Sequence, residues 1–472
     1  MRRSFSRIAA VLTVIAALGN AAVLPRPAAA AEAGPPGAVL AETEAPTQPA
    51  AAPGDFWTRD KLLGDIGGLR SAIAPYGMTL GLSETSEILG NPTGGLRRGA
   101  LYEGISDLNL RFDLQPYFHW RGVFFVRAFQ IHGRGLTVND LGNLFTASNI
   151  EATRTTRLFE LWYEQHIGDW LGIRIGQQAA DREFLVSSTA GLFINATFGW
   201  PILPATGLPS GGPAYPLGTP AIRFRAVANE EWTLLAGLFN GDPAGPGAGA
   251  DPQRRDLSGT AFRTRDGAFA IVETQYNPGN SKQNGTYRLG AWLNSEQFSD
   301  PHLDAGGVSL ASPASTGQPR LRRHDYSLYA VVDQPFLRDK DAESGFAAFA
   351  RVMGAPGDRN LVDLYLDGGL TYKGPFGRTD DHVGISLGYA RIGGSARALD
   401  ADVARLTGQP YPVRSGEAVL EVTYLFQLLP WWQVQPDFQY VFNPGGGIPN
   451  PAAPSRRLGD AAVFGVRTAI AF

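Results

Sequence analysis

The segment Asp460 to Phe472, DAAVFGVRTAIAF, decides the fold of this 472-residue chain. Counted back in steps of two from the last residue, one face is mostly large and apolar: Phe472, Ile470, Thr468, Val466, Phe464 and Ala462. The other face carries small side chains and Arg467. A side-chain period of two is the period of a β-strand. Because the chain ends on this strand, we expect it to close a transmembrane β-barrel, with its large face toward lipid and Arg467 toward a wet interior.

The composition supports strands and turns over helices. The chain has 58 Gly, 34 Pro and 11% aromatic residues. Its net charge of −3 is spread along the sequence, which argues against a nucleic-acid partner. Cysteine is absent, so thiolate metal sites and disulfides are excluded.

The first 75 residues divide into three predicted parts. Arg2, Arg3 and Arg7 precede an apolar run over 8–18 and an alanine stretch over 28–31, which together predict a signal peptide over 1–31. The alternative is an N-terminal membrane anchor, but the run is shorter than the ~20 residues that a spanning helix needs. Residues 32–54 predict a disordered linker. Residues 55–75 predict a short helical segment, capped by Thr58, at the periplasmic mouth.

Residues 76–472 are predicted to form the barrel, because later stretches are too short or too polar to span as helices and only a barrel then satisfies its backbone in lipid. Alternation predicts sixteen strands, at 76–89, 102–115, 121–131, 156–167, 170–178, 220–228, 231–240, 265–277, 285–297, 324–334, 345–354, 360–373, 381–392, 415–428, 431–442 and 460–472. Short connections mostly alternate with long ones, as periplasmic turns and outer loops do. A soluble all-β fold is the alternative, but it has no reason to keep its long loops at one end.

Arginine fixes which face of each strand points inward, because Arg facing lipid near the midplane is unfavourable by about 2–4 kcal/mol. We applied this rule to the fourth, fifth and sixth strands. The residues predicted to face inward are Glu160, Trp162, Glu164, Arg174, Arg223 and Arg225. The residues predicted to face lipid are Phe159, Leu161, Tyr163, Ile173, Ile175, Ile222 and Phe224. In strand 121–131, placing Arg127 inside also places Phe125 and Phe129 there.

The longest connection, 179–219, is predicted to fold into the barrel. Loops of this length are usually functional or disordered. This one mixes polar residues, Asp181, Glu183 and Asn195 among them, with apolar anchors that include Phe184, Leu192, Phe193, Ile194, Phe198 and Trp200. Such anchors predict packing on the inner wall and a narrowed lumen. The alternative is a surface loop with its own small apolar cluster.

The predicted pore-lining residues are Glu160, Trp162, Glu164, Arg174, Asp181, Glu183, Asn195, Arg223 and Arg225. Guanidinium groups and carboxylates bond neighbouring hydroxyls in pairs, and an aromatic ring packs on the apolar face of a sugar. Charges of both signs with an aromatic therefore favour a neutral, hydroxyl-rich solute. The alternative is that these charges brace the wall without touching solute.

Catalytic and cofactor signals are weak. Residues 384–388 match the G-x-S-x-G pattern, but they lie within an alternating strand and not at a strand-to-helix turn. The six histidines show no metal-ligand spacing, and no phosphate loop, Rossmann glycine pattern or EF-hand occurs. We therefore predict a channel that is not an enzyme and has no cofactor, although a hydrolase site spread over adjacent strands stays open.

The segments RLFELWYEQ (157–165), IRIGQQAADREF (173–184), LFINATFGWP (192–201), GPAYPLGTPAIRFR (212–225) and LFNGDPAG (238–245) resemble the carbohydrate-selective porin family of the bacterial outer membrane, the OprB type. FWTRDKLLGDIGGLR (56–70) and QPDFQYVFNPGG (435–446) also fit, and the resemblance thins between roughly 300 and 415.

The resemblance implies a sixteen-stranded outer-membrane barrel that passes sugars, chiefly monosaccharides such as glucose. Family porins narrow their channel with inward arginines and acidic residues, and matching positions here are Arg174, Arg223, Arg225, Glu160 and Asp181. An anion- or phosphate-selective porin, or a general diffusion porin, is the alternative. The expected partners are small sugars and outer-membrane lipid, with a monomer or a homotrimer as the assembly.

Overall fold

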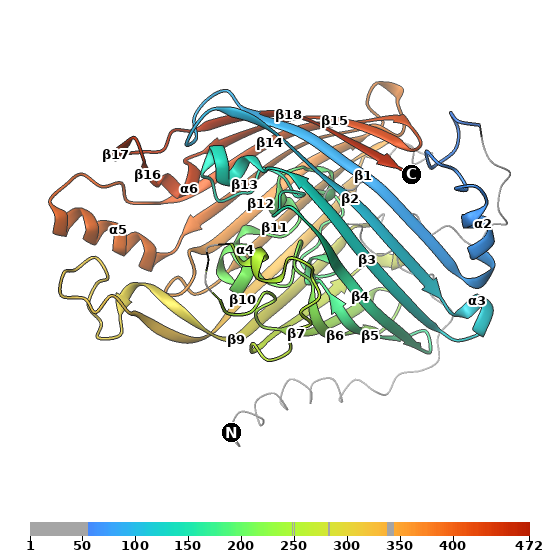
Figure 1. Ribbon diagram of the computed structural model, residues 1–472, viewed down its shortest axis with the longest axis horizontal. Helices are drawn as coiled ribbons and strands as arrows, with labels where there is room; N and C mark the ends of the chain where they lie inside the picture. The colour runs from blue at the N-terminus through green and yellow to red at the C-terminus, as the bar shows by residue number, and fades with distance from the viewer. Residues whose placement is uncertain (1–54, 248, 250, 282–283, 338–343) are drawn as a thin grey trace, which may run out of the picture. The chain divides into compact units, whose positions relative to one another are not determined.

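The computed structural model of the protein describes residues 55–472, except for 248, 250, 282, 283 and 338–343. Sixteen antiparallel strands of this part form a closed barrel in which chain neighbours pair around the ring (Figure 1). The strands are β1 (Met78–Asn91), β2 (Gly99–Asp113), β3 (Gly122–Gly133), β4 (Thr155–Ile167), β5 (Leu171–Gln178), β6 (Thr219–Val227), β7 (Trp232–Asn240), β8 (Ala268–Tyr276), β9 (Thr286–Asp304), β10 (Pro319–Phe336), β11 (Gly345–Gly354), β12 (Val362–Lys373), β13 (His382–Ile392), β14 (Gly416–Leu429), β15 (Trp432–Phe442) and β18 (Ala461–Ala471). The prediction of a sixteen-stranded barrel is confirmed.

Strand β18 closes the ring by pairing with both β1 and β15. Its outward residues Phe464 and Val466 are exposed, whereas Arg467 is buried on the inner side. There the Arg467 guanidinium binds Glu87 of β1, with Nε 2.6 Å from Oε2, and donates to Asn149 Oδ1 at 2.8 Å. The predicted orientation of the last strand is therefore confirmed, and an ion pair joins the first and last strands.

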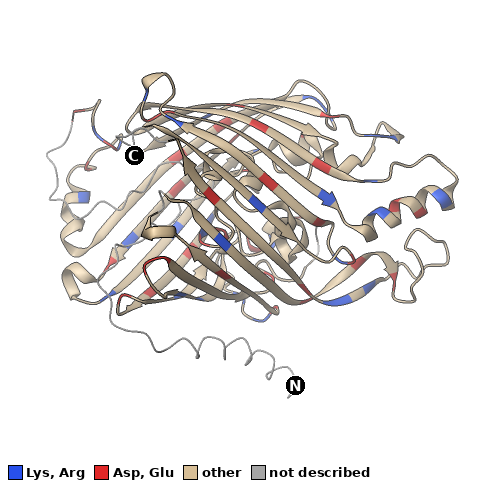
Figure 2. Cartoon of the chain, turned by 180° about the vertical axis from the view of Figure 1, so that it is seen from behind, with Lys and Arg blue, Asp and Glu red and all other residues tan. Residues whose placement is uncertain are grey.

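The inward orientation of charge extends around the barrel. Charged residues interrupt the strands along much of their length (Figure 2). On β5 and β6, Arg174 and Arg223 are buried inside while Ile175 and Phe224 are exposed outside, as predicted. On β3, Phe129 joins Arg127 on the inner face, also as predicted. The outer wall is thus apolar over most strands, as lipid requires.

Phe159 is an exception to the predicted orientation of β4. In the pairing of β3 with β4, Arg127 lies opposite Glu160 and Ala128 lies opposite Leu158, so Phe159 has no partner residue. This β-bulge shifts the inward face by one position. Phe159 is 0% exposed, and its ring lies 4.9 Å from that of Phe129. The prediction that Phe159 faces lipid is therefore wrong.

We expect Phe159→Ala to lower the free energy of unfolding by about 3–5 kcal/mol, because it leaves a cavity among packed side chains. The matched control is Leu161→Ala on the same strand, whose side chain is 44% exposed on the outer face. Thermal unfolding in detergent, followed by the electrophoretic shift of the folded barrel, checks this. Equal losses for both variants would contradict the inward placement of Phe159.

The connections are short at one end of the barrel and mostly longer at the other. The short end holds 114–121 with α3 (Gln115–Phe118), and also the connections from β4 to β5, β6 to β7, β8 to β9, β10 to β11, β12 to β13 and β14 to β15. The other end holds the connections from β1 to β2, β3 to β4, β5 to β6, β7 to β8, β9 to β10, β11 to β12, β13 to β14 and β15 to β18. Three features at the end with the longer loops were not predicted. The strands β9 and β10 extend well beyond their predicted bounds, and the helix α5 (Gly394–Thr407) forms in the loop between β13 and β14. The loop between β15 and β18 contains α6 (Pro444–Gly447) and a hairpin of β16 (Pro449–Asn450) and β17 (Ala453–Arg457).

The segment before the barrel is less helical than predicted. The helix α2 spans only Leu69–Ile73, followed by η1 (Ala74–Tyr76), and Thr58 caps neither. Helix cannot begin earlier because Ile66, Gly67 and Gly68 have left-handed backbone angles, with φ of 50°, 66° and 95°. The segment contacts the short-turn end, where Leu62 N donates to Ala471 O at 2.7 Å. The predicted signal peptide and linker lie outside the described residues. Within the described ranges, no helix combines the length and apolar character needed to cross a membrane.

Candidate functional site in the barrel interior

The loop between β5 and β6, residues 179–218, lies against the inner wall as an apolar body. Phe184, Phe193 and Phe198 are fully buried. The rings of Phe193 and Phe198 lie 5.8 and 6.1 Å from that of Phe349, which β11 directs inward. Short helices η3 (Ala180–Arg182), η4 (Ala190–Leu192), η5 (Ala196–Phe198), α4 (Ile202–Gly207) and η6 (Pro209–Gly211) fold this loop compactly. Its aromatic anchors therefore join the core and do not form a separate surface cluster.

Carboxylates of the wall accept hydrogen bonds from the backbone of this loop. Glu273 of β8 accepts from Leu185 N at 2.9 Å, and Asp333 of β10 accepts from Thr189 N at 3.1 Å. Glu421 of β14 accepts from Ile194 N at 2.5 Å and Asn195 N at 3.0 Å. Buried backbone N–H groups need such partners, and the irregular stretches between the short helices of the loop do not supply them. The loop is thus held on strands far from its own ends.

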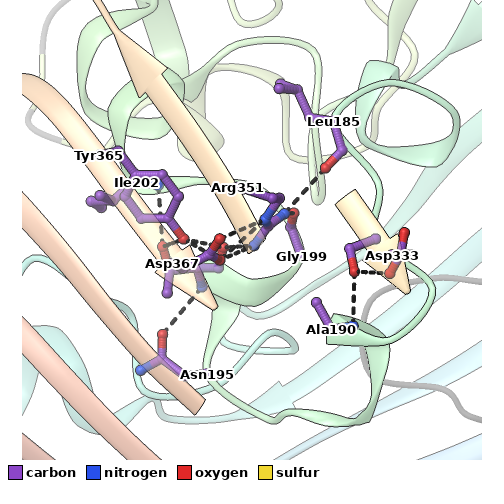
Figure 3. A network of polar contacts seen from close by, with 11 residues as sticks. Leu185, Ala190, Asn195, Gly199, Ile202, Asp333, Arg351, Tyr365 and Asp367 are labelled. Carbon is purple, nitrogen blue, oxygen red and sulfur yellow. Dashed lines mark hydrogen bonds and ion pairs between the residues drawn. The ribbon is translucent and has the colours of Figure 1, made fainter. Parts of the chain in front are cut away.

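Arg351 of β11 is the centre of the loop's attachment (Figure 3). Its guanidinium pairs with Asp367 of β12 and donates to three carbonyl oxygens of the loop, on Leu185 at 3.2 Å, Gly199 at 2.9 Å and Thr197 at 2.8 Å. Tyr365 OH also donates to Asp367 Oδ2, at 2.6 Å. The planar guanidinium group has five N–H donors in a fixed arrangement, so this one side chain can hold both ends of the segment 185–199.

A second loop, 134–154 between β3 and β4, also folds inward, which was not predicted. Glu417 of β14 accepts from Leu144 N and Phe145 N, each at 2.8 Å. The two loops touch where Asn149 N donates to Ile194 O at 2.8 Å. One signal for this docking was present in the alternation of β14, which places Glu417 and Glu421 inside the barrel, where each carboxylate requires a donor.

Charged residues form a cluster where β2 to β6 meet the long loop, which we call the wall cluster. It contains Asp107, Arg127, Glu160, Glu164, Arg174, Arg182, Glu183 and Arg223. Glu164 lies at one centre, with Arg174 Nη2 at 2.7 Å and Arg223 Nη2 at 2.9 Å. Glu183 of the loop lies 2.5 Å from Arg223. Four carboxylates face four guanidinium groups in this set, so their formal charges cancel.

Trp162 lies in the middle of the wall cluster. The Arg174 guanidinium carbon is 3.8 Å from the Trp162 ring centre, a cation–π contact, and the Phe125 ring stacks beside it at 4.9 Å. The indole Nε1 donates to Glu160 Oε1 at 3.3 Å. The ring is therefore covered by neighbouring side chains, and its contact with solute stays a prediction.

The other predicted residues are spread more widely. Asp181 is buried in the loop, where it accepts from Tyr215 N at 2.8 Å. Its burial raises the pKa of Asp181 to about 7. Asn195 lies on the opposite side of the barrel, where its Nδ2 donates to Gln439 Oε1 of β15 at 3.0 Å. Arg225 shares the inward face of β6 with Arg223 and is partly exposed. The structure thus brings six predicted residues together, namely Glu160, Trp162, Glu164, Arg174, Glu183 and Arg223.

A closed sixteen-stranded barrel with an apolar outer wall and a charged interior defines a porin of the bacterial outer membrane. The family model "Carbohydrate-selective porin, OprB family" matches residues 97–472, and the chain belongs to this family. Fold and family thus mark the protein as an outer-membrane sugar channel, in agreement with the resemblance seen in the sequence.

Individual relatives are distant in sequence. Porin B of Pseudomonas aeruginosa is 24% identical over 412 residues, covering 82% of this chain and 87% of that protein. The putative porin QuiX of Acinetobacter baylyi is 24% identical over 433 residues, covering 83% and 91%. The high-pH structure of Pseudomonas putida OprB superposes with a TM-score of 0.77 at 21% identity, covering 89% of this chain and 100% of that one. This last likeness concerns the fold.

Proposed function

We propose that the channel passes neutral monosaccharides such as glucose down their concentration gradient, without catalysis. The observation that carries this is the charge balance of the wall cluster, in which four carboxylates offset four guanidinium groups. A balanced cluster produces no strong local field for either ion sign, while its donors and acceptors suit hydroxyl groups.

We further propose that some of the predicted residues contact the solute and that the others hold them in position. Glu183, with 15% of its side chain exposed, and the partly exposed Arg225 contact the solute. Arg223, with 1% of its side chain exposed, holds Glu183 in place from behind. The loop 179–218 narrows the lumen at this height. The buried residues Glu160, Trp162, Glu164, Arg174, Asp181 and Asn195 then support this geometry and act on solute through it.

Liposome swelling tests the sugar preference. We expect liposomes that contain the protein to swell faster in glucose than in gluconate, an anion of similar size, because the balanced charges of the wall cluster give the anion no net attraction. Protein-free liposomes are the control for leakage. Equal rates would indicate a general diffusion porin.

The second candidate is an anion- or phosphate-selective porin. It is favoured by the partly exposed residue Arg225 and by the fact that of 41 basic residues only Lys61, Lys282, Lys340 and Lys373 are lysines. Zero-current potentials in planar bilayers under a salt gradient separate the two. Strong anion selectivity that phosphate blocks, with no response to glucose, would favour this candidate over the sugar channel.

A further inference from the structure

A hollow opens on the outer face of the barrel, where the long-loop ends of β1, β2 and β18 meet. It has a volume of about 540 Å³, and its lining residues include Ile88, Gly90, Arg98, Ala100 and Phe464. Ile88 and Phe464 are 57% and 54% exposed, whereas Leu89, the next residue of β1, is buried on the inner side. Because successive side chains of a strand point to opposite faces, the hollow faces lipid and not the lumen.

The hollow lies at the height of the outer leaflet. A tilted strand crosses the hydrocarbon core of a membrane in about 9–11 residues. The strand β1 begins at the short-turn end with Met78, so Ile88 lies near the outer limit of the hydrocarbon core. Arg98 comes directly before β2 and lies beyond this limit. The apolar part of the hollow therefore faces acyl chains, and Arg98 lies at the height of the lipid head groups.

Small residues form the floor of the hollow. Gly90 of β1 pairs with Ala100 of β2 on one side and with Phe464 of β18 on the other. The two small residues are in close contact, since a Cβ added at Gly90 would lie 3.0 Å from Ala100 Cβ. At other places the outward residues are large, as Leu238 and Leu328 are. An acyl chain can therefore approach the backbone more closely here than over those residues.

The loop 92–98, which borders the hollow, is held in place by several hydrogen bonds. Asn91 donates to Arg97 O at 2.8 Å and accepts from Gly99 N at 3.2 Å. The Arg97 guanidinium pairs with Asp140 of the neighbouring loop, with Nε 2.5 Å from Oδ1. The position of Arg98 is thus defined before any ligand binds, which lowers the entropy lost on binding.

Arg98 differs from Arg97 in its electrostatic contacts. Arg98 is exposed, and within the described residues it forms no ion pair. A guanidinium group binds phosphate through two parallel N–H···O bonds, and it does so more strongly than a neutral donor. An apolar hollow with a guanidinium group at its border is complementary to a lipid that carries both a phosphate and acyl chains.

We propose that the hollow binds lipid A, the phosphorylated and acylated disaccharide of lipopolysaccharide. One acyl chain lies over Gly90 and Ala100 beside Phe464, and one phosphate pairs with Arg98. Lipopolysaccharide forms the outer leaflet of the bacterial outer membrane, so lipid A is the anionic lipid at the height of this hollow. Phospholipids occupy the other leaflet, whose head groups lie at the short-turn end. The site is separate from the sugar path, because it lies on the opposite face of the wall.

Binding of fluorescent diphosphoryl lipid A to the delipidated protein in detergent tests the site. We expect one lipid A per barrel, and we expect Arg98→Glu and Ala100→Leu each to weaken its binding at least tenfold. Matched controls are Arg397→Glu, at an exposed arginine of α5, and Ala350→Leu, at an exposed outward alanine of β11, and both should bind as the wild type does. Wild-type affinity in either hollow variant, equal weakening in the controls, or equal affinity for phosphatidylglycerol would overturn the proposal.

Protection of a single cysteine tests the location and does not depend on the hollow variants. The natural chain contains no cysteine, so Ala100→Cys places a unique thiol in the hollow. Val352→Cys is the control, at an outward position of β11 that is 43% exposed. We expect lipid A to slow the reaction of Ala100→Cys with phenylmaleimide several-fold and to leave that of Val352→Cys unchanged. An unchanged rate at both positions, or equal protection of both, would contradict binding in the hollow.

Discussion

Arg351→Leu is expected to release the segment 185–199 from the barrel wall and to raise single-channel conductance several-fold. The side chain pairs with Asp367 and donates to three carbonyl oxygens of the loop, all of which lose their donor together. Breaking a buried pair by removing one partner costs about 3–5 kcal/mol. Planar bilayer recordings measure the conductance directly.

The double variant Arg351→Leu/Asp367→Leu separates the effect of releasing the loop from the effect of leaving Asp367 as an unpaired buried charge. It removes both charges, so we expect stability near that of the wild type but a conductance as high as that of the single variant. Arg322→Ala is a matched control, because this arginine pairs with Asp300 away from the long loop. A folded Arg351→Leu protein with wild-type conductance would mean that the loop does not limit flow.

Arg223→Ala/Arg225→Ala is expected to raise conductance, to weaken discrimination between glucose and larger oligosaccharides, and to introduce cation preference. The two residues share one face of β6 and are about 7 Å apart by strand rise. Loss of Arg223 leaves Glu164 and Glu183 with Arg174 as their shared partner. The wall cluster then carries one net negative charge, which attracts cations.

The matched control is Arg320→Ala/Arg323→Ala, which removes the same charge from the extended part of β10. Bilayer reversal potentials and liposome swelling with a series of oligosaccharides measure both effects. If the β6 variant folds but keeps wild-type conductance and sugar discrimination, these arginines brace the wall and the narrowest point lies elsewhere.

The barrel was predictable because one physical rule acts on every strand. Lipid outside and water inside impose a period of two, and arginines such as Arg174, Arg223 and Arg467 show which face is wet. The rule fails at Phe159, because a bulge changes the phase of a strand by a single residue and leaves no signature in the alternation.

The interior was less predictable, because its contacts join residues far apart in the chain. Composition indicated that the long loop packs inside, but not where. The bond from Ile194 to Glu421 joins positions 227 residues apart, and that from Phe145 to Glu417 joins positions 272 apart. No local pattern encodes such pairs. Strand alternation shows only that the hydrogen-bond acceptors for the loop are among the carboxylates that face inward.

These separations also bear on the order of folding. Wall residues that bind the backbone of the long loop, among them Glu273, Arg351 and Glu421, lie on β8 to β14, which follow the loop in the chain, so this docking cannot be complete before those strands have formed. Contacts of large sequence separation form late, since the entropy of closing long loops must be overcome first. If the ring closes before the loop docks, the lumen stays open until the carboxylates of the wall accept the loop's N–H groups.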